Sequence, residues 1–280
     1  MKPQARWGAV LAALLLAASA CAQAPKFEPQ VGQAGRDVIW VPTPDDVVHR
    51  MLAMAQVTPK DLVMDLGAGD GKIAIAAAKS FGARAIGIEY NPDMVKHANA
   101  QAQAAGVAGD GPGRALIRQG DIFQTDFSRA TVITLYLLPA LNMKLRPQLL
   151  AMRPGTRVVS HSFTMEDWEA DEISSIDGRR AYFWLVPANV AGSWTLEAGN
   201  QRHELALEQQ FQKVTGTVNL GAALQAGLRE PRLRGEAISF AYVDQAGLRR
   251  DFSGRVNGAR MEGTFRDERG AEGRWSAAKK

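Results

Sequence analysis

The 280-residue sequence contains a single cysteine, Cys21, and few histidines. One cysteine excludes a disulfide within the chain. The four histidines (His49, His97, His161 and His203) lie far apart, without an HExxH motif or a cysteine pair. The sequence also lacks GxSxG and any serine-histidine-acid pattern. Neither a metal site nor a serine hydrolase is therefore indicated, and we expect no metal.

A strong charge of either sign is also missing, because 33 basic residues stand against 29 acidic ones, for a formal charge of +4. Neither half of the chain has a basic cluster dense enough to predict a nucleic-acid partner. The arginines at 232, 234, 249 and 250 are interpreted as part of a solvated face.

Only the N-terminus carries a long apolar run. Lys2 and Arg6 precede this run, which ends in the small residues before Cys21. This is the pattern of an export signal, and no later run approaches the roughly 20 residues needed to span a bilayer. The signal resembles that of a bacterial lipoprotein, in which Cys21 would carry lipid; the alternative is ordinary cleavage after Ala20 or Ala24. We expect residues 1–21 to be a signal, residues 22–37 a tether, and the protein to be periplasmic or lipid-anchored.

The most informative stretch is LVMDLGAGDGKIAIAAAK, residues 62–79. A short apolar strand ends in Asp65, and three alternating glycines, Gly67, Gly69 and Gly71, precede a helix. Glycine permits a tight turn and close approach to a ligand, and a helix start offers free amide donors. Glu89 closes a second apolar strand 18 residues after Gly71, where its carboxylate can accept ribose hydroxyls. The pattern predicts an adenosine cofactor.

The detail of the loop favours S-adenosylmethionine over a dinucleotide. The dinucleotide motif GxGxxG requires glycine where Lys72 stands. Asp65 would repel a pyrophosphate but would attract the sulfonium and ammonium groups of S-adenosylmethionine. After a third strand, Asp121 and Ile122 can supply a carboxylate and an apolar side chain to an adenine.

Four motifs resemble class I S-adenosylmethionine-dependent methyltransferases: DLGAGDG (65–71), GIEYNP (87–92), GDIF (120–123) and RPG (153–155). The resemblance covers roughly residues 38–188. VPTPDDVV (41–48) and TLYLLP (134–139) are similar to a bacterial group akin to the mitochondrial lysine methyltransferases that modify the ATP synthase c-subunit and the adenine nucleotide translocase.

The resemblance implies a role for each matching residue. Asp65, Gly67 and Gly69 would line the methionine end of the cofactor, Glu89 would bind ribose, and Asp121 and Ile122 would flank adenine. Tyr136, at the end of the fourth strand, would face the methyl group and is our candidate catalytic residue. The acceptor would be a protein, with lysine as the candidate residue, or a small-molecule nucleophile.

The flanking sequence predicts a Rossmann-like, doubly wound α/β domain with a seven-stranded sheet over residues 38–188. Thr43 is predicted to cap a helix running from Pro44 to about Gln56. The segment before this helix is predicted either to close over the cofactor or simply to start the helix. Strands at 172–176 and 180–186 are predicted to form a hairpin at the edge of the sheet.

From residue 189 onward the helical periodicity disappears. Short alternating runs separated by Asp/Asn-Gly turns predict a small antiparallel β-domain, a barrel or a sandwich, over residues 189–280. Its predicted core residues are aromatic: Trp194, Phe240, Tyr242, Phe265 and Trp275.

Two functions remain open from the sequence. The first is an exported methyltransferase, and the second is a non-catalytic envelope protein that uses the same fold as a scaffold for the β-domain. The export signal keeps the second alternative open, because S-adenosylmethionine is made and used in the cytoplasm.

Overall fold

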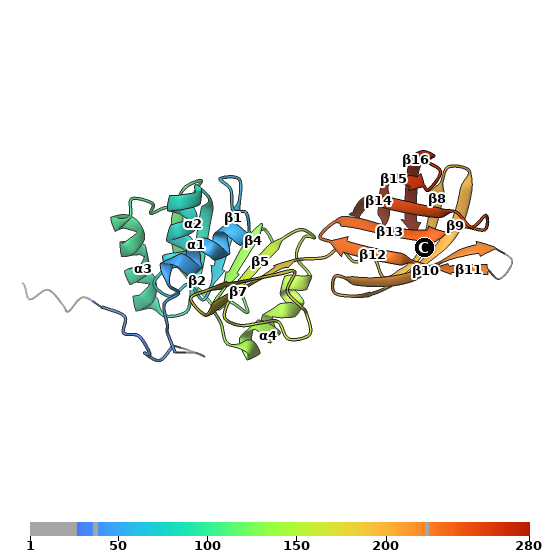
Figure 1. Cartoon of the computed structure of the whole chain (residues 1–280). Helices are drawn as coiled ribbons and strands as arrows, with labels where there is room; N and C mark the ends of the chain where they lie inside the picture. Colours follow the sequence, from blue (N-terminus) through green and yellow to red (C-terminus); the bar gives the residue numbers. More distant parts are fainter. Residues whose placement is uncertain (1–26, 36–38, 222–223) are drawn as a thin grey trace, which may run out of the picture.

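The computed structural model describes residues 27–35, 39–221 and 224–280, which form two bodies, an α/β domain and a β-domain (Figure 1). The predicted export signal and the lipid site at Cys21 lie outside the described residues.

The α/β domain is built on a seven-stranded mixed sheet in the order β3-β2-β1-β4-β5-β7-β6. Strands β1 to β5 are parallel, and β7 and β6 add antiparallel strands at one edge. The chain order reverses between β1 and β4, the place where α/β folds bind ligands beyond the carboxyl ends of the strands. The strands are β1 (Leu62–Leu66), β2 (Arg84–Glu89), β3 (Ala115–Gln119), β4 (Val132–Leu135), β5 (Arg157–His161), β6 (Glu172–Ile176) and β7 (Arg179–Leu185).

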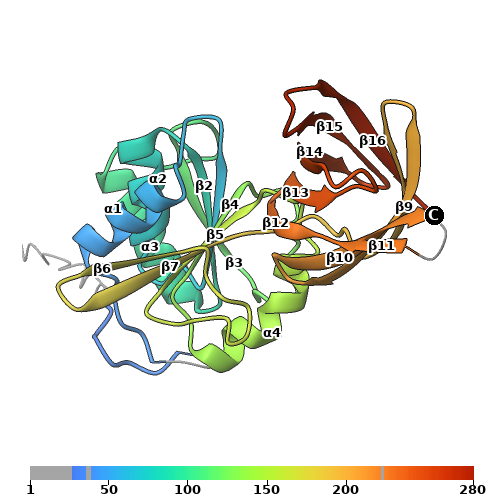
Figure 2. The same cartoon turned by 45° about the vertical axis from the view of Figure 1, so that its right-hand side comes forward.

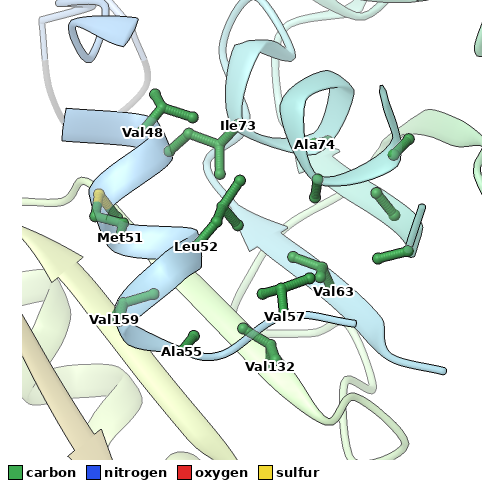
Figure 3. Close-up of a cluster of buried hydrophobic side chains, with 14 of the residues drawn as sticks. Val48, Met51, Leu52, Ala55, Val57, Val63, Ile73, Ala74, Val132 and Val159 are labelled. Atoms are coloured by element: carbon green, nitrogen blue, oxygen red, sulfur yellow. The ribbon is translucent and has the colours of Figure 1, made fainter. Parts of the chain in front are cut away.

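Helices cover both faces of this sheet. They are α1 (Asp45–Met54), α2 (Lys72–Phe81), α3 (Pro92–Ala104) and α4 (Pro139–Leu150). Figure 3 shows how apolar side chains of α1 and α2, such as Leu52 and Ile73, meet Val63 and Val132 of the sheet. On the other face α4 buries Leu145 in a separate cluster with residues of β1, β4 and β5. The predicted doubly wound fold is confirmed.

The start of α1 differs from the sequence prediction. The helix runs over Asp45–Met54 with Pro44 as its N-cap, and no side chain caps it. The Thr43 hydroxyl, predicted to be the cap, instead lies 3.2 Å from Nδ1 of His161. The Thr43 hydroxyl, which the local sequence predicts to be a helix cap, therefore contacts His161 of β5 instead.

The predicted edge hairpin is confirmed, with β6 and β7 paired antiparallel. Asp177 and Gly178 form its turn with φ angles of 46° and 77°. Positive φ at both central residues gives a turn whose twist matches that of the strands.

The β-domain is a nine-stranded antiparallel sheet in the order β11-β10-β9-β8-β16-β15-β14-β13-β12, curled into a nearly closed barrel (Figure 2). All five predicted aromatic core residues are buried inside it. The strands are β8 (Gly192–Ala198), β9 (Gln201–Gln210), β10 (Lys213–Gly221), β11 (Leu224–Gly227), β12 (Arg229–Arg234), β13 (Ala237–Val243), β14 (Arg249–Asn257), β15 (Arg260–Asp267) and β16 (Glu272–Lys279).

The β-domain attaches to the sheet at the end opposite the carboxyl ends of the parallel strands. It follows the last residue of β7, and the Ala188 amide donates to the Gly235 carbonyl at 2.9 Å. A Cβ on Gly235 would lie 3.2 Å from Cα of Gly155, just before β5 begins, so two backbones meet closely there. The carboxyl ends of the strands remain open to ligands.

Candidate functional site

The glycine loop after β1 has the conformation that its sequence predicts. Gly67, Gly69 and Gly71 have φ angles of 83°, 54° and 79°, which disfavour residues with a Cβ. Gly69 is also closely packed, because a Cβ there would lie 2.6 Å from Nε1 of Trp40. The loop thus presents bare backbone toward the space above β1 and β4.

Asp65 is a carboxylate buried at the end of β1, with 2% of its surface exposed. The Thr134 hydroxyl donates to its Oδ1 at 2.7 Å. Burial, with smaller contributions from the negative charges of Asp70 and Glu89, raises the pKa of Asp65 to about 7. A buried carboxylate of this kind is stabilised in its ionised form by a nearby cation, which fits the ammonium or sulfonium of S-adenosylmethionine.

Glu89 joins the loop to the next helix. Its Oε2 accepts a hydrogen bond from the Gly69 amide, and its Oε1 accepts one from the Asn91 amide, both at 2.9 Å. Asn91 in turn caps α3 through its side chain. Because each carboxylate oxygen can accept more than one hydrogen bond, both oxygens can still receive ribose hydroxyls.

All of the predicted site residues line one cavity of about 290 Å³: Asp65, Gly67, Gly69, Glu89, Asp121, Ile122 and Tyr136. They come from the ends of the central strands and the loops that follow. The structure therefore brings the predicted residues together, while their individual roles stay predictions. Asp121 is held by an Asx-type turn, in which its Oδ1 accepts the Phe123 amide at 2.9 Å.

Tyr136 lines this cavity beside two aromatic rings. Its ring centroid lies 4.0 Å from that of His161 and 6.1 Å from that of Phe163. Burial raises the pKa of Tyr136, so its hydroxyl stays protonated at physiological pH. Rings in this position can hold an alkylated or cationic group against their faces.

His161 lies behind Tyr136 and outside the cavity lining. It is 3% exposed, and desolvation lowers its pKa to about 4, so the imidazole is neutral at physiological pH. Its Nδ1 contacts the Thr43 hydroxyl, and its Nε2 is buried without a hydrogen-bond partner in the described chain. The imidazole thus packs against the Tyr136 ring on one side and contacts Thr43, in the segment that precedes α1, on the other.

Two residues of the segment after β5, Asp167 and Trp168, have structural contacts. The Asp167 carboxylate pairs with Arg146 of α4. Trp168 is fully buried in the core, and its carbonyl accepts the Trp184 indole N–H at 2.8 Å.

Sequence reasoning did not identify Trp40 and Phe163, which also line the cavity. Trp40 belongs to a short hairpin in which the Gly32 amide donates to the Trp40 carbonyl and the Trp40 amide donates to the Gln33 carbonyl, both at 2.9 Å. This hairpin places the indole over the glycine loop. The predicted tether, 22–37, includes part of it. The position of Trp40 directly before VPTP is the one signal in the sequence that points to it.

The part of the chain that the structure describes contains neither a metal-binding cluster nor a helix that could span a membrane. No group of three or more His, Cys, Asp or Glu side chains there is arranged to hold a metal ion. Likewise, no helix among the described residues has the length and apolarity to cross a membrane.

Comparison with known proteins identifies the family to which the domain with this site belongs. The model of the ANTKMT methyltransferase domain matches residues 65–172. A protein-lysine N-methyltransferase of Saccharolobus islandicus is 44% identical over 142 residues, which are 50% of this chain and 86% of that protein. The chain belongs to this methyltransferase family.

Two further members show how far the likeness extends. The mouse lysine N-methyltransferase of the ATP synthase C subunit is 32% identical over 133 residues, and the match spans about half of each chain, 47% of this one and 51% of that protein. A solved structure from Salinibacter ruber, described as an RNA methyltransferase in complex with S-adenosyl-L-homocysteine, is 50% identical with a TM-score of 0.51. It covers 54% of this chain and 96% of its own. The protein is an S-adenosylmethionine-dependent methyltransferase, and the β-domain lies beyond the residues that the family model matches.

Proposed function

We propose that this methyltransferase acts on a lysine side chain of a protein. The archaeal and mouse relatives are both described as lysine N-methyltransferases. The observation that carries the proposal in this molecule is the chemistry of the cavity mouth, where Tyr136 and Phe163 stand beside exposed apolar side chains such as Ile39 and Leu138.

A lysine must lose its proton before it can accept a methyl group. An apolar, aromatic entrance lowers the pKa of an inserted ammonium by desolvation, which leaves the neutral amine as the nucleophile. When bound, S-adenosylmethionine supplies an electrophilic methyl group on a sulfonium. The protein's own part is to align the amine, to exclude water, and to hold the cofactor through Asp65 and Glu89. The lysine ammonium would first lose one proton. On transfer, an N–C bond would form as the S–CH3 bond breaks, so the nitrogen would gain the positive charge and neutral S-adenosylhomocysteine would leave.

RNA is another acceptor to consider, since the Salinibacter relative is described as an RNA methyltransferase, and the cavity argues against it. Among the described residues that line the cavity, Lys72 is the only cation, and it pairs with Asp45 at 2.9 Å. Four carboxylates (Asp65, Asp70, Glu89 and Asp121) line the same space. An RNA acceptor would require basic side chains near the entrance for its phosphates.

Methyl transfer from labelled S-adenosylmethionine to fractionated protein and RNA tests the proposal directly. We expect label in protein, at methylated lysine by mass spectrometry, and its loss in Glu89→Ala. Label confined to RNA, or to a protein residue other than lysine, would refute lysine as the acceptor.

We further propose that the protein is exported and lipid-anchored through Cys21, on the strength of its N-terminal sequence alone. Expression in a bacterium fed with labelled fatty acid should label the wild-type protein in the envelope fraction. A Cys21→Ser variant should stay unlabelled. Equal labelling of both proteins, or recovery of both in the cytoplasm, would contradict this proposal.

A further inference from the structure

The outer face of the β-domain carries a groove of about 800 Å³ that no sequence motif predicts and that lies on a different domain from the cofactor cavity. Strands β12 to β16 form its floor. Their inward residues, such as Phe240, Phe252 and Trp275, fill the barrel, so the residues between them point outward. The groove is therefore an external surface and does not enter the barrel.

One row of side chains crosses this floor from strand to strand. In the strand register Arg232 pairs with Ser239, Ser239 with Ser253, Ser253 with Thr264, and Thr264 with Arg274. Three short hydroxyl side chains thus lie between two arginines. The small residues create the hollow, and the arginines stand at its two ends.

The charge of the groove is positive on balance. Its lining includes five arginines and three carboxylates. Arg249 is neutralised by Glu230 and Asp251 at 2.8 and 2.9 Å, and Arg266 has a looser pair with Glu272 at 3.7 Å. The remaining arginines, Arg229, Arg232 and Arg274, form no ion pair among the described residues and can bind an anionic partner.

The kind of anion follows from the side chains present. Guanidinium groups bind carboxylates and phosphates with two parallel hydrogen bonds. The phenylalanine rings under the groove belong to the barrel core, so no exposed ring is present on which a base could stack. None of the exposed large apolar residues of the described chain lies in the groove. The groove therefore has no apolar side chain that could insert into a lipid surface.

We propose that this groove binds an extended acidic polypeptide segment. Arg232 and Arg274 are four strand spacings apart, and at about 4.8 Å per spacing the path along the curved sheet between their backbone positions is about 19 Å. An extended peptide covers that span in about six residues. Carboxylates about six positions apart would reach both arginines, and the hydroxyls between them would meet the peptide backbone.

Binding of a fluorescent peptide to the full-length protein tests this proposal without any methyl transfer. The probe has two glutamates six positions apart in a glycine-serine background, and a second probe has them two positions apart. We expect saturable, salt-sensitive binding that is tighter for the wider spacing. A double Arg232→Gln, Arg274→Gln variant should bind at least about tenfold more weakly with an unchanged melting temperature, because two charged hydrogen-bonded contacts are lost.

A control variant, Arg202→Gln with Arg260→Gln, removes two exposed positive charges of the same domain outside the groove. Its peptide affinity should stay within about twofold of wild type at moderate salt. The proposal is overturned if neither peptide binds, if the control loses as much affinity as the groove variant, or if oligouridylate or polygalacturonate binds the groove more tightly than the peptide.

Discussion

At the scale of single residues, the buried Asp65 sets a pH dependence for the cofactor site. Its pKa of about 7 lies above the usual value of 3.8, so the folded protein holds a proton that the unfolded chain releases. This contribution to stability is complete below pH 3.8 and is lost as the pH rises through about 7. We expect cofactor binding to have the opposite sign, because in the predicted site only the ionised Asp65 carboxylate attracts the cationic cofactor.

We therefore predict that the affinity for S-adenosylmethionine rises as the pH increases from about 6 to about 8, and that Asp65→Asn weakens binding and removes this pH dependence. Without cofactor, the melting temperature of Asp65→Asn should be several degrees above that of wild type at about pH 8. Well below pH 6 the two melting temperatures should be similar. Calorimetric titration and thermal melts measure both effects. A wild-type affinity independent of pH would show that Asp65 does not ionise to bind the cofactor.

Tyr136 offers a second prediction at this scale. Tyr136→Ala should lower the rate of methyl transfer by about 100-fold, because the acceptor loses the surface that aligns it. Tyr136→Phe keeps the ring that packs on His161 and should lose far less, since the hydroxyl stays protonated throughout. Single-turnover rates with cofactor at saturation separate alignment from cofactor binding. Equal rates for wild type and Tyr136→Ala would remove this residue from the catalytic assignment.

At the scale of elements, the sequence predicted the parts of the site that are formed by one continuous segment of the chain. The turn from β1 into α2 and the carboxylate at the end of β2 follow from local glycine and strand patterns. The contact between Thr43 and His161 joins residues 118 positions apart, and no local pattern encodes it. Trp40 reaches Gly69 because a hairpin upstream of α1 folds back over the loop. The Thr43 hydroxyl contacts His161 and does not cap α1, which begins one residue later than predicted.

This hairpin gives a prediction at its own scale. Trp40→Ala should weaken cofactor affinity about tenfold, because the loss of an aromatic contact costs about 1 to 2 kcal/mol. Gly69→Ala should abolish binding, since its Cβ would meet the indole and its φ of 54° disfavours alanine. Combining the two changes should not restore binding, because the backbone strain remains. Restoration in the double variant would show that the indole clash alone matters.

At the scale of the whole molecule, the two domains dock through the turn between β9 and β10. Phe211 stacks on Trp168 with ring centroids 6.0 Å apart, and the Arg146 guanidinium carbon lies 5.2 Å above the Phe211 ring. Lys213 adds an ion pair with Glu169 at 2.7 Å. These contact residues do not line the cofactor cavity, and the β-domain begins at the opposite end of the sheet.

Loss of the contact between the two domains should therefore leave methyl transfer largely unchanged. Phe211→Ala should destabilise the interface by about 2 kcal/mol through lost apolar burial and split thermal unfolding into two transitions, while methyl transfer to a small soluble acceptor stays within about twofold of wild type. Phe211→Leu, which keeps most of the apolar contact, serves as the control and should unfold nearly as wild type. Scanning calorimetry and X-ray scattering follow the separation of the domains. A parallel loss of methyl transfer in Phe211→Ala would mean that the β-domain holds the α/β domain in its active shape.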